Sequence, residues 1–184
     1  VHSVRSTATV LSHLRAAGAL NMGALNLDEF GLGTSGNNEH FGRCRNPWNR
    51  EFISGGSSSG AACALAARLV FGALGTDAGG SLRIPASACG VVGFKPTFGR
   101  VSRHGVVSHS FTLDHVGPIA RTVRDCARLT SVIAGKDERD TDSIDTPVPD
   151  YESRLDRSVH GVRMGVVGGF EDDVSEEVRQ RLEE

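Results

Sequence analysis

The sequence has no apolar run long enough to cross a membrane, because its best candidate, residues 61–74, is interrupted by Arg68 and Gly72. It also has no basic stripe: the 20 Lys and Arg are balanced by 22 Asp and Glu, which argues against direct nucleic-acid binding. The opening residues, VHSVRSTATV, lack the charged head and apolar middle of a signal peptide. We therefore expect a cytoplasmic protein that binds neither membrane nor nucleic acid.

Cysteine and lysine are scarce, and both shortages limit the chemistry. The four cysteines, Cys44, Cys63, Cys89 and Cys126, form no CxxC pair. A zinc or thioredoxin-like site is therefore not indicated, and we expect four reduced thiols and no metal or organic cofactor. Lys95 and Lys136 are the only lysines of the chain.

What the chain does have is an ordinary globular composition with an excess of glycine. Of 184 residues, 39% are hydrophobic and 23% are charged, which is enough for one domain with a core. Glycine accounts for 23 residues, well above the usual frequency of about 7%. Such an excess indicates many tight loops, and loops commonly carry chemistry.

Helical and strand patterns alternate along the chain, which favours an α/β fold. In the first half, apolar spacing predicts a helix over residues 7–17, a short buried strand over 19–23 and a long loop over 26–54. Ser59 is expected to cap a helix over residues 60–70, and short strands are expected at 71–75 and 91–94.

In the second half, residues 101–110 have a weak pattern that fits a strand or a loop. Thr122 and Asp125 predict a capped helix that ends at Gly135. Residues 136–156 are polar and indicate a surface connection, and residues 162–167 indicate a strand. Asp173 is expected to cap a final helix.

Two glycine-embedded serine clusters, GGSSSG (residues 55–60) and GTDAGGSLRIP (75–85), carry the strongest chemical signal. A serine hydroxyl becomes a nucleophile only when a base takes its proton. Neighbouring glycines allow main-chain N–H groups to approach a substrate oxygen closely. Two such loops, joined by one helix, predict a serine hydrolase site around Ser57 and Ser81.

Other interpretations of the glycine-rich segments remain open. GLGTSG (residues 31–36) matches the letters of a dinucleotide-binding motif, but no strand pattern precedes it and no helix pattern follows. GSSSG (56–60) matches the nucleophile elbow of an α/β-hydrolase, with Ser58 as nucleophile. Glycine–serine clusters also occur simply as turns.

Taken together, GGSSSG, GTDAGGSLRIP and CGVVGFKPTFGRVS resemble the amidase signature family. LRAAGALNMG, LNLDEF, FGRCRNPW, SFTLDHVGPIARTVRD and IAGKDERD resemble further blocks of that family in the same order. The resemblance implies an α/β fold with a twisted mixed β-sheet flanked by helices. Residues 1–184 would then form part of a single amidase signature domain.

The resemblance also implies a Ser–cisSer–Lys triad and an acyl-enzyme. Ser81 matches the nucleophile, and Ser57 matches the bridging serine that follows a cis peptide, with Ser58 beside it as a supporting residue. The main-chain amides of Ala78, Gly79, Gly80 and Ser81 match the oxyanion hole. Asp77 and Arg83 match a charged pair that braces the loop. Ser59 stands where the family usually has a glycine.

The lysine of the triad lies upstream of the matched blocks in this family, so we expect it outside this chain and expect the 184 residues alone to be inactive. Exposed sheet edges are also expected to make the isolated chain dimerise or aggregate.

The resemblance covers both amidases, which hydrolyse an amide to acid plus ammonia or amine, and the glutaminase component of the tRNA-dependent Glu/Asp amidotransferase. That component commonly has Gln after the arginine of the second block, where this chain has Ile84. We therefore favour a free-standing amidase acting on a small-molecule amide and forming a homodimer. The alternative is association with amidotransferase B and C subunits. A non-catalytic relative used for interaction is a third possibility.

Overall fold

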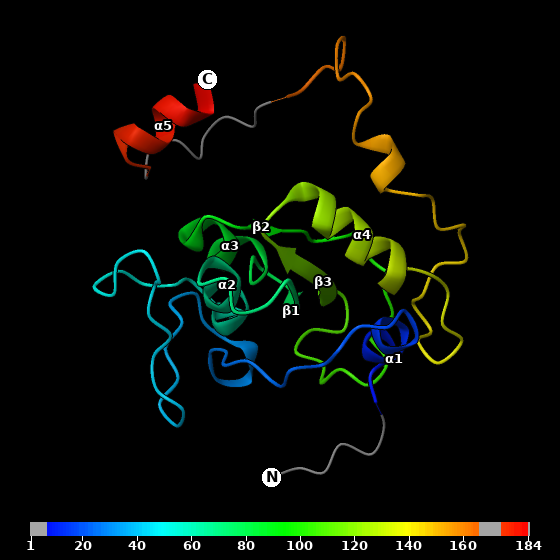
Figure 1. Cartoon of the computed structure of the whole chain (residues 1–184), viewed down its shortest axis with the longest axis horizontal. Coiled ribbons are helices and arrows are strands. Elements are labelled where there is room, and N and C mark those ends of the chain that lie inside the picture. Colours follow the sequence, from blue (N-terminus) through cyan, green and yellow to red (C-terminus); the bar gives the residue numbers. More distant parts are fainter. Residues whose placement is uncertain (1–6, 166–173, 184) are drawn as a thin grey trace.

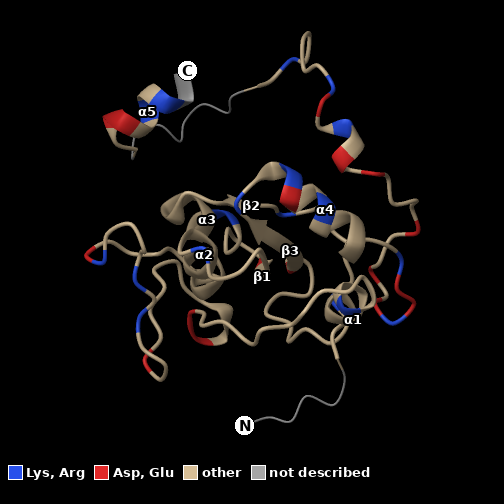
Figure 2. Ribbon diagram, viewed as in Figure 1, with Lys and Arg blue, Asp and Glu red and all other residues tan. Residues whose placement is uncertain are grey.

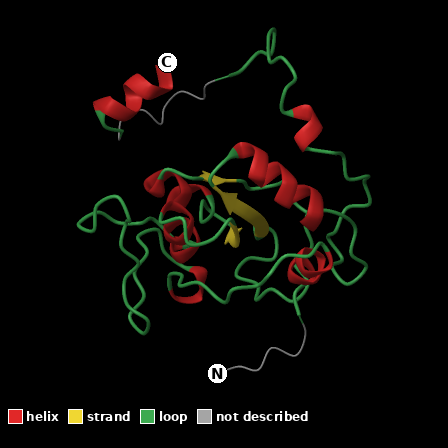
Figure 3. Cartoon of the chain, in the orientation of Figure 1, coloured by secondary structure: helices red, strands yellow, loops and turns green. Residues whose placement is uncertain are grey.

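The computed structural model describes residues 7–165 and 174–183. A small central sheet is surrounded by short helices and long loops (Figures 1 and 3). The helices are α1 (Thr9–Ala16), α2 (Ser59–Ala66), α3 (Arg83–Cys89), α4 (Val123–Ile133) and α5 (Glu176–Glu183), with 3-10 turns η1 (Glu29–Gly31) and η2 (Glu152–Arg154). The strands are β1 (Gly72–Asp77), β2 (Val92–Gly93) and β3 (His115–Ala120).

The sheet has the order β1-β3-β2, and both pairings are antiparallel. The expected α/β class is therefore confirmed, but the described sheet is antiparallel rather than mixed. The two short outer strands both pair with β3, so no parallel neighbours arise in the described part of the chain. Gly72 pairs with Ala120 and Asp77 with His115, which places the end of β1 beside the start of β3.

The helices pack on this sheet through two apolar clusters. One joins α2, α3 and β3 through Ala61, Leu65, Leu82, Ala86 and Ile119. The other joins α1, α4 and the loops near them through Ala8, Val10, Val101, Val116, Ile133 and Ala134. Since β3 contributes Val116 to one cluster and Ile119 to the other, it links the two halves of the core. The loops that leave the sheet on either side are therefore anchored to the same strand.

Helix α4 shows how local sequence directs an element. Thr122 has an extended backbone, and its hydroxyl accepts a hydrogen bond from the N–H of Asp125, as the capping pattern predicts. Cys126, Thr130 and Ile133 are buried along one face of the helix, which packs on the sheet. Basic and acidic residues are interspersed along α4 and the outer loops rather than segregated by sign (Figure 2).

Three expectations about local structure are wrong. Residues 19–23 form no strand, because their apolar side chains have no strand to pair with; Leu20 and Met22 are 88% and 80% exposed. Ser58, not Ser59, precedes helix α2, and neither side chain caps it. Residues 136–156 include three buried polar side chains, Asp137, Asp140 and Ser143. Asp137 accepts from Thr9 of α1 and from Ser102, Asp140 accepts from the N–H of Arg103, and the Ser143 hydroxyl accepts from the N–H of Asp137.

The remaining expectations have mixed outcomes. The helices near residues 7–17, 60–70 and 122–135, the strands near 71–75 and 91–94 and the loop at 26–54 are confirmed. Residues 101–110 are a loop except for a bridge from Val101 to Ala134, and residues 162–165 are not a strand. The rest of the 162–167 prediction and Asp173 lie outside the described residues. None of the described helices is long and apolar enough to span a bilayer.

Candidate active site

The two serine loops lie together at one end of the sheet. The first is held by the N-terminus of α2, and the second connects β1 to α3. The N–H of Ser58 donates to the carbonyl of Ser81 across 3.2 Å, which fastens one loop to the other. The peptide bond between Gly56 and Ser57 is cis, as the resemblance implies. Residues 55–60 and 75–85, distant along the chain, therefore form one structural unit.

Ser81 faces a cavity, whereas Ser57 is buried next to it. The cavity has a volume of about 760 Å³, and Ser81, Ala78 and Thr76 form part of its wall. Ser57 is 1% exposed, and its Oγ would lie 3.9 Å from a Cβ built on Gly31, which also lines the cavity. Among the described residues the two hydroxyls form no direct hydrogen bond. Their relay is therefore a proposal that rests on the shared loop contact.

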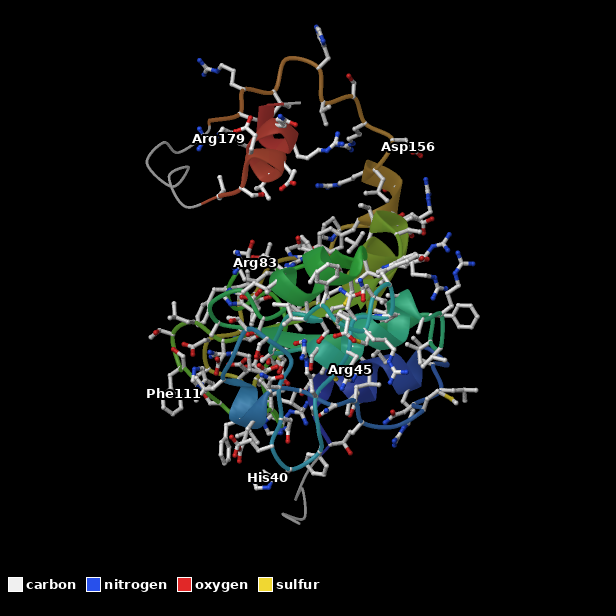
Figure 4. The ribbon with its side chains drawn as sticks, turned by 90° about the vertical axis from the view of Figure 1, so that its left-hand side faces the viewer. His40, Arg45, Arg83, Phe111, Asp156 and Arg179 are labelled. Carbon is white, nitrogen blue, oxygen red and sulfur yellow. The ribbon has the colours of Figure 1, made fainter. Side chains whose placement is uncertain are left out.

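The turn that carries Ser81 is organised by Asp77. This fully buried carboxylate accepts hydrogen bonds from the N–H groups of Gly80 (2.8 Å) and Leu82 (3.1 Å). Arg83 donates to both of its oxygens, at 3.0 and 2.9 Å, and the Arg83 label in Figure 4 shows where this pair lies. Burial raises the pKa of Asp77, but these hydrogen bonds outweigh it and hold the pKa below its ordinary value. The structure thus forms the bracing pair implied by the resemblance.

Main-chain amides beside Ser81 are available for an anion, with one exception. The N–H of Gly80 is occupied by Asp77, so Gly80 cannot donate to a substrate in this conformation. In the described part of the chain, the N–H groups of Ala78, Gly79 and Ser81 donate no hydrogen bond. Of the amides predicted to form an oxyanion hole, those of Ala78, Gly79 and Ser81 therefore have no competing acceptor among the described residues.

Ser58 has a structural position. Its hydroxyl donates to the carbonyl of Thr76 and accepts from the N–H of Thr76, both at 3.3 Å. These bonds tie the start of α2 to β1, and a Cβ on Gly75 would come within 2.5 Å of the Ser58 Oγ. No histidine of the described residues bonds to Ser58, so the geometry does not support the nucleophile-elbow interpretation.

Asp28 is a site residue that sequence reasoning missed. It is 2% exposed, its N–H donates to the carbonyl of Ser57 at 3.1 Å, and its Oδ2 accepts from the N–H groups of Ser35 and Gly36 at 3.4 and 3.2 Å. The GLGTSG loop thus wraps the carboxylate of its own chain, which leaves no support for a dinucleotide site. The sequence signal that could have identified Asp28 was its place in DEF (residues 28–30), directly before that glycine-rich loop.

The other oxygen of Asp28, Oδ1, has no hydrogen-bond partner among the described residues. A Cβ added to Gly56 would lie 2.4 Å from this oxygen, closer than any real Cβ contact. Glycine at position 56 therefore lets the cis peptide lie directly against a buried carboxylate. Asp28 holds the Ser57 loop from one side while Ser81 holds it from the other.

The rest of the cavity combines aromatic and charged groups. Phe30 and Phe111 contribute apolar surface. The side chain of Arg103 also lines it but is already engaged by Asp140, by Asp142 and by the carbonyl of Phe111, so it acts mainly as a brace for this wall. Within residues 7–165 and 174–183, no set of three or more His, Cys, Asp or Glu is arranged to hold a metal ion.

Nearly the whole chain is similar in sequence to known proteins. A family model described as Amidase matches residues 3–184. The A subunit of glutamyl-tRNA(Gln) amidotransferase from Roseiflexus castenholzii is 51% identical over 181 residues, which cover 96% of this chain and 37% of that protein. The chain thus spans little more than a third of the length of such curated relatives.

Solved structures agree in fold. A structure reported for a vestigial protein complex, bearing on the origins of an s-triazine catabolic enzyme, is 40% identical with a TM-score of 0.94; the match covers 97% of this chain and 39% of that one. The peptide amidase of Stenotrophomonas maltophilia is 43% identical with a TM-score of 0.78, over 81% of this chain and 32% of that one. The structural elements described above therefore recur in proteins of known fold.

Proposed function

Because the chain belongs to the amidase family, we propose that the protein hydrolyses carboxylic amides through an acyl-enzyme on Ser81. The observation that carries this proposal is the junction of the two serine loops. The cis Gly56–Ser57 loop is fastened to Ser81 by the 3.2 Å bond from Ser58, beside a cavity that Ser81 and Ala78 line. The substrate is a small-molecule amide that enters this cavity.

In the proposed reaction, the hydroxyl of Ser81 attacks the amide carbonyl while Ser57 takes its proton and passes one to a neutral lysine. The developing oxyanion is held by the unoccupied amides of Ala78, Gly79 and Ser81, and each good donor lowers the barrier by about 3 kcal/mol. The relay then reverses to protonate the departing amine or ammonia. Water hydrolyses the acyl-enzyme and releases the acid.

The lysine of this scheme is proposed to lie outside these 184 residues. Lys95 Nζ lies 3.4 Å from the Nε2 of His115, and Lys136 Nζ donates to the carbonyl of Ser143 at 3.0 Å. No hydrogen bond connects either ammonium to Ser57 among the described residues. This supports the expectation that the isolated chain does not turn over amides.

The test uses the protein expressed from its complete reading frame and labelled with a fluorophosphonate, a reagent that activated serines attack. Ser81→Ala is expected to abolish labelling, and Ser57→Ala to slow it about 10²–10⁴-fold through loss of the proton relay. Ser58→Ala should still label, because the Ser58 hydroxyl bonds to the main chain of Thr76, and the main-chain bond from Ser58 to Ser81 is kept in alanine. Labelling that persists in Ser81→Ala but disappears in Ser58→Ala would transfer the nucleophile to Ser58.

A second candidate is the glutaminase component of a tRNA-dependent amidotransferase, and the specific observation in its favour is the relative from Roseiflexus castenholzii. The 51% identity to this relative weakens the preference for a free-standing amidase, which was based on Ile84. Co-purification with B and C subunits, together with glutamine hydrolysis that rises when tRNA and ATP are added, would select this candidate. Hydrolysis of simple amides by a homodimer, unaffected by tRNA, would select the free-standing amidase.

A further inference from the structure

Three of the four cysteines, far apart in the sequence, lie close together around Arg45 and Ser54, next to the first serine loop. Cys44 is in the long loop before them, Cys63 is on α2, and Cys89 ends α3. The Sγ of Cys63 donates to the carbonyl of Arg45 at 3.3 Å, which places Cys63 beside the residue that follows Cys44. Arg45 is labelled in Figure 4 and marks this part of the loop.

The third thiol adjoins the same loop. Cys89 donates from Sγ to the carbonyl of Ser54 at 3.4 Å, and the hydroxyl of Ser54 donates to the carbonyl of Cys44 at 3.1 Å. The thiols of Cys44 and Cys63 each affect the pKa of the other, and those of Cys63 and Cys89 do the same, so the three side chains are neighbours. Cys63 is therefore the central thiol, with Cys44 on one side and Cys89 on the other.

The three thiols differ in access. Cys89 is fully buried, whereas Cys44 and Cys63 are half-buried and can meet a small solute. From these positions we propose that Cys44 and Cys63 form a reversible disulfide when the protein meets a small-molecule disulfide such as oxidised glutathione. This inference is independent of the proposed function, because it uses no group of the serine relay.

The exchange is balanced in atoms and electrons. The thiolate of Cys63 attacks one sulfur of the small-molecule disulfide and releases one thiol. The thiolate of Cys44 then attacks the Cys63 sulfur of this mixed disulfide and releases the second thiol. The two cysteines lose two protons and two electrons, and the small-molecule disulfide becomes two thiols.

The environment of Cys63 keeps the reduced form inert without an oxidant. The hydrogen bond with Cys44 lowers its pKa, while the bond with Cys89 and burial raise it, and the net pKa is about 11. The hydrogen bond with Cys63 and burial likewise raise the pKa of Cys44, so both thiols are protonated near neutral pH. The pair therefore forms a disulfide slowly, on exposure to oxidant, rather than acting as a fast thiolate catalyst.

The disulfide would close a ring that contains the whole first serine loop. Residues 44 and 63 flank the segment from Ser54 to Ser59, including the cis Gly56–Ser57 bond. Cross-linking such a ring restricts the unfolded chain, which raises stability by an amount that grows with ring size. The site would thus be held more firmly under oxidising conditions.

The test treats the protein expressed from its complete reading frame with oxidised glutathione, digests it with trypsin without reduction and identifies linked peptides by mass spectrometry. The Cys44–Cys63 disulfide joins peptide 44–45 to peptide 51–68. We expect this link, a mass lower by two hydrogen atoms, and a melting temperature higher by about 5–10 °C that returns to the starting value after reduction.

Matched variants separate the outcomes. Cys44→Ala is expected to lose the link and the rise in melting temperature, whereas Cys89→Ala and the distant Cys126→Ala should keep both. The proposal is overturned if peptide 51–68 is linked instead to the Cys89 peptide, or if oxidised glutathione stays attached to Cys63 without forming a link. Circular dichroism of the reduced variants checks that each one folds.

Discussion

At the scale of single residues, the site depends on buried carboxylates that organise main-chain amides. Asp77 binds two amides and Arg83, and Asp28 binds the amides of Ser35 and Gly36. The carboxylate of Asp77 arranges the Ser81 loop, whereas Asp28 fixes the 31–36 loop with its carboxylate and holds the Ser57 loop through its main-chain N–H. The two serines therefore owe their positions to residues that take no part in the chemistry. Hydrogen bonds to charged groups of this kind each contribute about 1.5–3 kcal/mol.

Asp77→Asn is expected to lower stability at neutral pH by about 1–3 kcal/mol, because a buried partner of Arg83 loses its charge. It should also change the response to acid. The folded-state pKa of Asp77 lies below its unfolded value near 3.9, so its contribution is fully present above pH 4. That contribution is lost as pH falls through the folded-state pKa.

Denaturant titrations between pH 2 and 7 measure this effect. Wild type should lose up to about 1.4 kcal/mol more per pH unit below pH 4 than Asp77→Asn does. The exposed Asp145→Asn serves as the control and should follow wild type. Parallel curves for wild type and Asp77→Asn would contradict the assignment of Asp77 as the charged brace.

At the scale of elements, β3 connects the packing of the whole sheet. It pairs with both other strands, and Gly117 in its middle lies against the carbonyl of Phe94 and the side chain of Leu82. A Cβ at this position would come within 2.1 Å of that carbonyl oxygen. The strand therefore requires a glycine where β-sheets usually avoid one.

Gly117→Ala is expected to destabilise the protein by about 1–3 kcal/mol, because backbone and core atoms must move to admit one methyl group. Gly79→Ala is the matched control, since a Cβ there meets no atom within 4 Å and the position has no left-handed backbone. Urea midpoints at constant slope measure both. Equal midpoints for the two variants would show that β3 yields more easily than its contacts indicate.

At the scale of the whole molecule, much apolar surface lies outside the two core clusters. Leu20 and Met22 are almost fully exposed on the segment after α1, and Phe71 is 88% exposed. Leu20 and Met22 lie two residues apart in the chain, and neighbouring exposed apolar side chains favour association. The described surface is therefore consistent with the expectation that the 184-residue chain self-associates.

Light scattering at increasing concentration tests this expectation. The chain should show a rising apparent mass, and the double change Leu20→Ser and Met22→Ser should reduce it. Val107→Ser, at another exposed apolar position, provides the control and should have a smaller effect. A single monomeric mass for the unchanged chain across the concentration range would contradict the expectation.

The sequence alone was sufficient where short-range chemistry decides the outcome. The Thr122 cap, the helical spacing of α1 and the glycine–serine loops could be predicted because each depends on neighbours within a few residues. The cis peptide at Gly56–Ser57 followed from the family resemblance. The family itself could be identified because its motifs lie within continuous segments of chain.

Only the tertiary structure decided the features that join distant segments. Gly117 and Pro118 argue against a strand, yet β3 is central because Phe94, Leu82 and β1 pack around it. Residues 19–23 have a strand-like pattern but no partner, so they form no strand and stay exposed. The role of Asp28, the capture of Gly80 by Asp77 and the meeting of Cys44 with Cys63 likewise arise from contacts across the fold, which no local pattern encodes.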